Sequence, residues 1–422
     1  MRPADSAPAV CGGASASSAP AAARLRGVTA LPGPSAAPID GDCDARFAAV
    51  RQAFAANFAD QDEIGAAVCV YVDGRCVVDL WGGYVDADRA WPWQRDTLIN
   101  AYSVGKGVLA VLVLALVEQG LVELDAPVAK LWPEFAASGK GELSVRTLLS
   151  HGAGLPAVRE RLPENAMYDW QRMVGALGAQ APYWEPGSDH GYHVNSYGFL
   201  AGELVRRATG LDVGAALARF VTGPVDAEFH YGLPRSEHRR VASFLGPDLR
   251  LTEEWQWAKA FPPSGDDAHD RMIWHAYFNP SGISGMGTVN TAPWRLATIP
   301  STNGHATARG VSAIYSAFLA GGPAGARWPG AALRAEATSI HADGEDRVLA
   351  RPSRFGLGFQ LAQPTRPLGP NAGAFGHYGY GGSLGFADPA AGVAFGYLMS
   401  RPGERWQTPR TQRLIDAVYA CL

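Results

Sequence analysis

The chain has 422 residues, of which 47% are hydrophobic, and a formal net charge of −4 at pH 7. This length allows one large domain or two closely associated ones, and the apolar content is ample for a buried core. No basic cluster stands out, so we do not expect nucleic acid or an anionic membrane as a partner. No apolar stretch approaches the ~20 residues that a membrane span requires.

The cysteines are odd in number and lack the spacing of a metal site. We expect free thiols in a reducing compartment, with one or two disulfides as the alternative. The five residues are Cys11, Cys43, Cys69, Cys76 and Cys421. No metal or other cofactor is expected, and the oligomeric state is not readable from the sequence.

The N-terminal segment differs in composition from the rest of the chain. Residues 1–38 are rich in Ala, Pro, Ser and Gly and have almost no large apolar side chains. This composition predicts a disordered extension over residues 1–40, with ordered structure from about Asp44. The extension lacks the continuous apolar core of a secretory signal, so we expect a cytoplasmic location.

A hairpin is the first β-structure predicted along the chain. Residues 45–58 carry apolar positions at helical spacing, and β-rich runs follow at 66–72 and 75–81. Asp73 and Gly74 stand between these runs. A type I′ turn needs φ > 0 at both central positions and favours Asp-Gly there, so the two runs are predicted to pair.

The middle of the chain is predicted to be mostly helical. Residues 104–119 form a long apolar helix that Gly120 ends, and helical patterns continue from about 121 to 261. Residues 262–287, which include the acidic run 266–270, are predicted to form an irregular loop. A solvated acidic loop is favoured there over a metal site.

Strand patterns return in the C-terminal part, at 355–361 and 392–399, with helices at 310–319 and 411–419. Strands at both ends of the chain around a helical middle predict an α+β fold, an α/β sandwich. Its antiparallel sheet would be built from both chain ends and flanked by helices, with a mostly helical domain inserted.

These patterns also predict how the chain divides. A hydrolase domain is expected over residues 41–422. Its α/β part would cover about 44–120 and 290–422, and its mostly helical part about 121–289.

One lysine stands in a position suited to catalysis. Lysine occurs four times among the 36 basic residues, and only Lys106 follows a serine, Ser103, by three positions. At the start of an apolar helix, such a Ser-x-x-Lys pair lies on one face, one turn apart. Burial would lower the pKa of Lys106 and make it a base for the hydroxyl, whereas the alternative is a capping serine beside a solvated lysine.

Two further segments carry residues suited to the same chemistry. Tyr192 can hold or relay a proton when nearby cations lower its pKa, with aromatic packing as the alternative. Glycines are dense in the segment 375–389, so main-chain N–H groups there can point into a cleft, as an oxyanion hole requires. A plain glycine-rich turn is the alternative.

The same segment contains a misleading motif. Residues 381–385 match Gly-x-Ser-x-Gly, the nucleophile elbow of α/β-hydrolases, which requires a helix after the serine. A second strand is predicted to follow instead, so Ser383 is not expected to be the nucleophile.

Together, these elements resemble the serine β-lactamase and penicillin-binding protein superfamily, in particular its family VIII carboxylesterases and related class C-like hydrolases. The likeness covers about residues 47–422. Supporting blocks are found at 78–83, 124–128, 148–156, 300–305 and 385–389. The resemblance implies a β-lactamase-like fold, with Ser103 as the acylated nucleophile and Lys106 as its base or proton relay.

The resemblance also implies roles for residues further along the chain. Tyr192 matches the tyrosine of a Tyr-x-Asn motif. The run His377-Tyr378-Gly379 takes the place of Lys-Thr-Gly, and the backbone N–H groups of Ser103 and Tyr380 would form the oxyanion hole.

This chain departs from the β-lactamase pattern at two positions. Val194 stands at the place of the motif's asparagine, so that amide contact is missing unless Asn195 replaces it. His377 stands at the place of a lysine, and its charge would depend on pH if the ring is accessible. Both departures favour neutral esters over penicillins and cell-wall peptides.

The resemblance therefore implies a serine carboxylesterase, EC 3.1.1.-, that cleaves small esters through an acyl-serine intermediate. Weak β-lactamase, small-peptide hydrolase and acyltransferase activities are the alternatives on the same site. A non-catalytic binding or scaffold protein is the alternative of another class.

Overall fold

The computed structural model describes residues 37–246, 264–404 and 406–422. A nine-stranded antiparallel sheet is its central element. In sheet order, the strands are β1 (Ile39–Cys43), β3 (Arg75–Gly83), β2 (Gly65–Val72), β12 (Val393–Met399), β11 (Leu384–Asp388), β10 (Phe375–Tyr378), β9 (Gln360–Leu361), β8 (Arg351–Phe355) and β7 (Ala342–Asp346).

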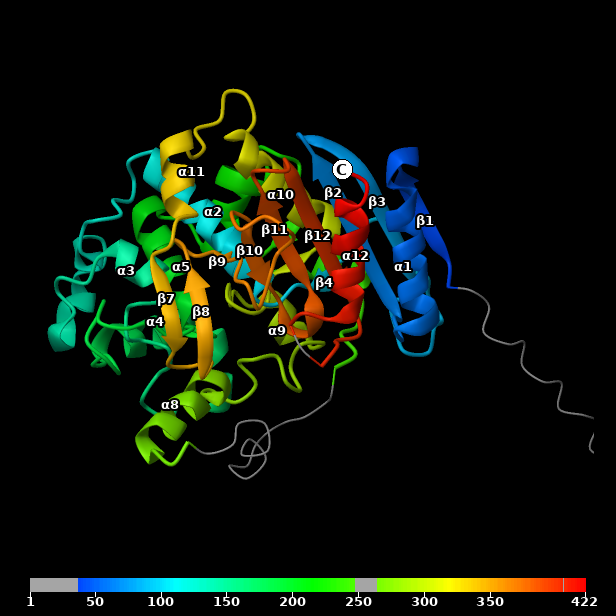
Figure 1. Ribbon diagram of the computed structural model, residues 1–422. Coiled ribbons are helices and arrows are strands. Elements are labelled where there is room, and N and C mark those ends of the chain that lie inside the picture. Colours follow the sequence, from blue (N-terminus) through cyan, green and yellow to red (C-terminus); the bar gives the residue numbers. More distant parts are fainter. Residues whose placement is uncertain (1–36, 247–263, 405) are drawn as a thin grey trace, which may run out of the picture. The chain divides into compact units, whose positions relative to one another are not determined.

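Both ends of the chain build this sheet, as predicted. Strands β1 to β3 come from the N-terminal part and β7 to β12 from the C-terminal part, and the two sets meet where β2 pairs with β12 (Figure 1). That pairing runs in register from Val72 opposite Val393 to Ala66 opposite Met399. The predicted fold class, an antiparallel sheet flanked by helices, is confirmed.

The predicted hairpin forms β2 and β3. Asp73 and Gly74 both have positive φ, +48° and +78°, as the type I′ turn requires. Strand β1 begins at Ile39, ahead of the expected start of ordered structure at Asp44, because its backbone pairs with β3. Residues 1–36 of the predicted extension lie outside the described residues, and the domain boundary near residue 41 stays a prediction.

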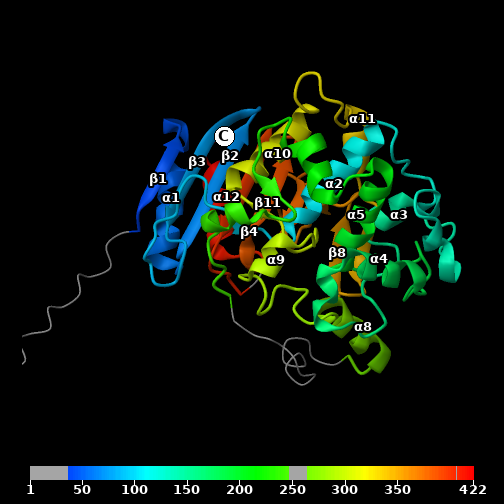
Figure 2. The same ribbon diagram turned by 180° about the vertical axis from the view of Figure 1, so that it is seen from behind.

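Helices cover both faces of the sheet (Figures 1 and 2). Helices α1 and α12 pack against each other on one face, and α10 and α2 lie on the other. The described helices are α1 (Ala48–Asp60), α2 (Val104–Glu118), α3 (Val145–Leu149), α4 (Trp170–Ala179), α5 (Ser196–Thr209), α6 (Val213–Leu217), α8 (Asp267–Phe278), α9 (Ala292–Leu296), α10 (Ala308–Ala320), α11 (Ala331–Ala337) and α12 (Pro409–Tyr419).

Helix α2 runs through the centre of the molecule. Every side chain from Val108 to Leu116 is fully buried, as expected of a helix that is apolar on all sides. It contacts α5 on one side and β10 and β11 on another. Its first turn is therefore held rigidly, and this turn carries Ser103 and Lys106.

Two predictions about secondary structure were wrong. The expected loop at 262–287 contains α8, which begins where the Asp266 carboxylate accepts hydrogen bonds from the N–H groups of Ala268 and His269, at 2.9 and 3.2 Å. The expected strand at 355–361 is interrupted, because Gly358 takes φ +84° and separates β8 from β9.

The predicted helical middle also contains part of a small sheet. Strand β5 (Phe229–His230) pairs with β6 (His305–Ala306), which pairs with β4 (Ile99–Asn100). No described helix has the length and apolar content needed to span a bilayer. The four described cysteines are free thiols, whereas Cys11 lies outside the described residues.

Candidate active site

Ser103 lies where the chain turns into α2. Tyr102, just before it, is buried and has φ +50°, a conformation that non-glycine residues rarely adopt. The first turn of the helix is fixed from outside by Tyr231, whose hydroxyl donates to the carbonyl of Gly105 at 2.5 Å. Ser103 itself is half-buried.

Lys106 lies next to this hydroxyl and is fully buried. Its Nζ is 3.0 Å from Ser103 Oγ and 2.9 Å from the carbonyl oxygen of Ser301. Burial holds the pKa of Lys106 well below that of an ordinary lysine. The predicted closeness of the two side chains is found, and the lowered pKa favours the neutral amine that a base requires.

The contact with Ser301 was not predicted from the sequence. Ser301 lies in the loop before β6, and its hydroxyl accepts a hydrogen bond from the N–H of Gly198 in α5 at 2.6 Å. Asn303 braces the same loop, because its amide donates to the carbonyls of Trp294 and Ala297. The supporting block at 300–305 therefore has a physical role, which is to aim a carbonyl at the lysine.

Tyr192 completes the group. Lys106 Nζ is 4.8 Å from the centre of its ring, and the tyrosine is 1% exposed. Burial raises the pKa of Tyr192 well above 10, although the neighbouring Ser103 hydroxyl lowers it in part. The pKa of Tyr192 is therefore raised and not lowered, because the cost of burying the charged phenolate exceeds the effect of the neighbouring groups. The phenol is thus protonated, and its oxygen has no well-formed hydrogen bond within the described residues.

Asp346, at the end of β7, positions Tyr192. Its carboxylate is 2% exposed and accepts the N–H of Tyr192 at 2.9 and 3.1 Å. The ring of Tyr192 packs parallel to Phe355, with centroids 6.0 Å apart, and edge-on against Trp406 at 5.6 Å. Sequence reasoning missed Asp346, and no local motif marks it.

His377 is buried beside Lys106 and Tyr192. Its ring lies 5.8 Å from that of Tyr192, and its Nδ1–H donates to the carbonyl of Tyr378 at 2.7 Å. Burial, with a smaller effect of Lys106, lowers the pKa of His377 to about 3. The ring is therefore neutral near pH 7, and the pH-dependent charge considered for an accessible histidine does not arise.

Gly379 and Tyr380 lie against the start of α2. A Cβ on Gly379 would stand 2.6 Å from the carbonyl oxygen of Ala101, so only glycine fits this approach. The ring of Tyr380 packs edge-on against Tyr102, with centroids 5.5 Å apart. Within the described residues, the N–H groups of Ser103 and Tyr380 donate to no other group. One unused donor is therefore on Ser103 itself, and the other is on a segment that packs against Ala101 and Tyr102, just before it.

Two other residues considered from the sequence, Ser383 and Asn195, do not belong to the group formed by Ser103, Lys106 and Tyr192. Ser383 is fully buried and precedes β11, so the elbow motif lacks its helix. Asn195 does not replace the missing amide, because it donates to Ala276 and Ser284 and accepts from Thr302, all within 3.0 Å. In the described parts of the chain, no group of His, Cys, Asp and Glu is arranged to hold a metal ion.

Comparison with known proteins agrees with this geometry. The family model described as Beta-lactamase matches residues 50–420. The chain belongs to the beta-lactamase family. Among its relatives in this family, Esterase/beta-lactamase LipL of Mycobacterium tuberculosis is 34% identical over 382 residues, which cover 89% of this chain and 86% of the relative. Esterase EstB of Burkholderia gladioli is 27% identical, with 85% and 91% covered.

Solved structures of the family superpose over most of this chain. A family VIII carboxylesterase matches with a TM-score of 0.83 and 39% identity, over 91% of this chain and 100% of that one. A penicillin-binding protein homologue from Caulobacter crescentus matches with a TM-score of 0.81 and 38% identity, over the same shares of the two chains. The predicted membership and fold are confirmed by these matches.

Proposed function

We propose that this protein is a serine hydrolase that cleaves small carboxylic esters through an acyl intermediate on Ser103. The observation that carries the proposal is the 3.0 Å separation between Ser103 Oγ and the buried amine of Lys106. A neutral amine at this distance takes the hydroxyl proton as the oxygen attacks. Relatives named as esterases, which cover most of the chain, support the same reaction class.

In the first step, Ser103 Oγ bonds to the ester carbonyl carbon while its proton passes to Lys106. The carbonyl oxygen becomes an oxyanion, and the N–H groups of Ser103 and Tyr380 stabilise it, each by roughly 3 kcal/mol. The carbon–oxygen bond to the alcohol then breaks. Tyr192 gives its proton to the leaving alcohol and recovers one from Lys106.

In the second step, water repeats the sequence in reverse. Water attacks the acyl carbon while Tyr192 and Lys106 take its proton, and the bond to Ser103 Oγ breaks as the serine regains a proton. Burial lowers the pKa of Lys106 and raises that of Tyr192, which suits a base and a proton donor in the resting enzyme. Neutral His377 and the apolar Val194 favour esters over β-lactams.

The proposal is tested by hydrolysis of p-nitrophenyl esters from acetate to dodecanoate, with nitrocefin alongside. Wild type is compared with Ser103→Ala, Lys106→Ala and the control Ser383→Ala, which removes the serine of the misleading motif. Ester turnover that persists only in wild type and the control is expected. A fluorophosphonate probe, mapped by mass spectrometry, should label Ser103.

Other outcomes would redirect the assignment. Nitrocefin turnover equal to that of the best ester would make the protein a β-lactamase, and failure of wild type to take up the probe would favour the non-catalytic alternative. Turnover that survives in Ser103→Ala would show that another serine is the nucleophile.

A further inference from the structure

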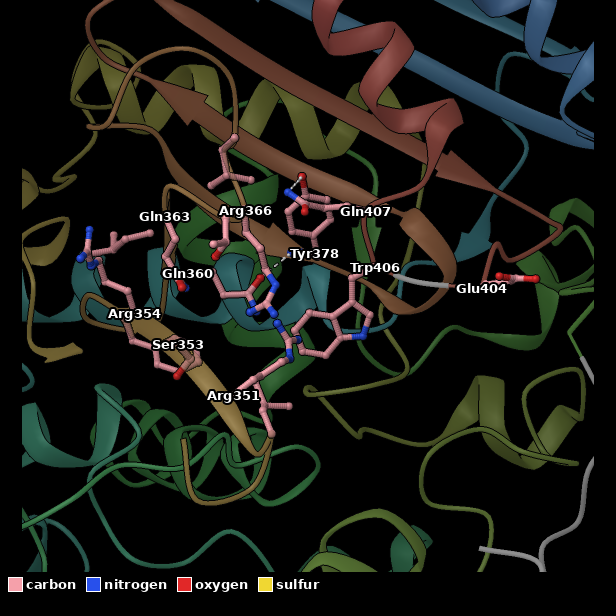
Figure 3. Close-up of a pocket in the computed structure, with 15 residues that line it drawn as sticks. Arg351, Ser353, Arg354, Gln360, Gln363, Arg366, Tyr378, Glu404, Trp406 and Gln407 are labelled. Carbon is pink, nitrogen blue, oxygen red and sulfur yellow. Dashed lines mark hydrogen bonds between the residues drawn. The ribbon is translucent and has the colours of Figure 1, made fainter. Parts of the chain in front are cut away.

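A cavity of about 550 Å³ lies beside the catalytic group (Figure 3). Strands β8 and β9, the loop that follows β9 and the segment before α12 form its walls. Three arginines line it: Arg351, Arg354 and Arg366. Binding cavities usually place a few charged groups where they orient a ligand, so the partners of these arginines are informative.

Only one of the three has an acidic partner. Arg354 pairs with Asp343 at 2.8 Å and points away from the other two in Figure 3. Arg351 and Arg366 form no ion pair within the described residues. The one acidic lining residue, Glu404, is exposed and points away from both.

The two unpaired arginines are held in place and point toward each other (Figure 3). Arg366 donates from one guanidinium nitrogen to the carbonyl of Pro352 at 3.1 Å, which brings its charge beside β8. The guanidinium of Arg351 lies 4.7 Å from the centre of the Trp406 ring. Both side chains are half-buried.

Two like charges that converge in a partly buried cavity repel each other unless an anion lies between them. Burial already lowers the pKa of Arg366. A carboxylate satisfies both guanidinium groups, because its two oxygens match their paired N–H donors. The cavity therefore offers two donor groups that one carboxylate can bridge.

The cavity shares walls with the catalytic group. Phe355 and Trp406 line the cavity, and both pack against the ring of Tyr192. Tyr378, another lining residue, follows His377 directly. One aromatic layer therefore separates the arginine pair from the proposed proton donor.

We propose that the ester substrate carries a carboxylate, bound by Arg351 and Arg366, at the end remote from the bond that is cleaved. This inference rests on the proposed esterase function and names its substrate class. The positive charge thus lies in the cavity, whereas the position of the family's lysine holds His377, which is neutral near pH 7.

The test compares esters that differ only in a carboxylate. On the acyl side, the pair is mono(4-nitrophenyl) adipate and 4-nitrophenyl hexanoate. On the alcohol side, it is 4-acetoxybenzoate and its methyl ester. The measured quantity is the ratio of kcat/KM for the charged ester to that for the neutral one, in wild type, Arg351→Gln, Arg366→Gln and the control Arg354→Gln.

Wild type should prefer the charged member of one pair, and that pair shows whether the acyl or the alcohol group enters the cavity. Each of Arg351→Gln and Arg366→Gln should lower the ratio by about 10- to 100-fold, as expected when a hydrogen-bonded charge loses its partner. Arg354→Gln should leave it unchanged. Ratios near one for both pairs in wild type, or equal ratios in all variants, would overturn the proposal.

A binding measurement separates this inference from the proposed function. Ser103→Ala is titrated calorimetrically with monomethyl adipate and with 4-acetoxybenzoate. The ligand that matches the preferred ester pair should bind, and its binding should be lost when Arg366→Gln is added. Binding without ester turnover in wild type would retain the anion site and reject the esterase. Turnover of neutral esters, with no binding of the carboxylate ligands and no preference for charged esters, would retain the esterase and reject the anion site.

Discussion

Asp346→Ala is expected to damage both stability and catalysis. The buried carboxylate accepts hydrogen bonds from four donors: the N–H groups of Tyr192, Val348 and Leu349, each at 2.9 Å at its nearest, and the Ser353 hydroxyl at 2.7 Å. A hydrogen bond to a charged group contributes about 1.5–3 kcal/mol. Water entering the vacated space recovers part of this, so we expect a loss of about 3–5 kcal/mol in the free energy of unfolding.

The catalytic effect follows from the position of Tyr192. A shift of about 1 Å in a reacting group lowers the rate by about 10²-fold, and Asp346 is the residue that holds the tyrosine backbone. Asp346→Asn keeps the Oδ1 acceptor that all three N–H groups use, so its effect on stability should be smaller, about 1–2 kcal/mol.

Urea unfolding followed by tryptophan fluorescence, together with ester turnover, measures both effects. Asp343→Ala is the matched control, because Asp343 lies on the same strand but forms a partly exposed ion pair with Arg354. Such a pair contributes at most about 1 kcal/mol. The reasoning is refuted if Asp346→Ala unfolds at the same urea concentration as Asp343→Ala and keeps the wild-type kcat.

Three further predictions concern the catalytic group and its surroundings. Lys106→Arg should lower kcat by about 10²- to 10⁴-fold, because a guanidinium stays protonated and cannot act as the base; near-normal turnover would contradict this. Gly379→Ala should lower kcat by about 10²- to 10³-fold, because the new Cβ would meet the carbonyl of Ala101 at 2.6 Å and displace the Tyr380 N–H that we propose as an oxyanion donor; a kcat within twofold of wild type would count against it. Burial lowers the pKa of His377 to about 3, so the unfolded chain binds a proton below pH 6.5 that the folded chain does not, and stability falls as pH falls. Burial raises the pKa of Glu63 to about 7, so Glu63 makes the protein more stable as the pH falls from 7 to 4.5. The effect of His377 is therefore isolated by comparing wild type with a His377 variant. When the pH falls from about 7.5 to about 5.5, wild type should lose about 1.4 kcal/mol more of its free energy of unfolding, measured in urea, than His377→Asn loses. Equal losses would refute the lowered pKa of His377.

Local features of the chain were predictable because their causes lie within a few residues. The Asp73-Gly74 turn follows from the positive φ that these two residues accept. The central helix follows from the apolar run 107–117, and Gly120 lies just past the end of the helix. The Ser103–Lys106 pair is set by helical spacing alone, since residues three apart share a face.

The two wrong predictions of secondary structure arose where the local sequence signal was weak. Helix α8 begins with an acidic run that resembles a loop, and its capping by Asp266 is visible only in three dimensions. The strand pattern at 355–361 hides the turn at Gly358, because alternation of apolar residues does not reveal a change in φ.

The electrostatic state of the site depended on contacts between distant segments. Lys106 and Ser301 are 195 residues apart, and Tyr192 and Asp346 are 154 apart. Packing of these segments excludes water, which lowers the pKa of Lys106 and raises that of Tyr192.

The sequence therefore determined which residues approach each other along one helix and which turns the backbone makes, because both depend on short-range geometry. Tertiary structure decided which of those residues are buried, which ionisable groups have shifted pKa values and which arginines of the cavity lack an acidic partner. Desolvation and ion pairing depend on every segment packed around a group, and those segments come from all parts of the chain.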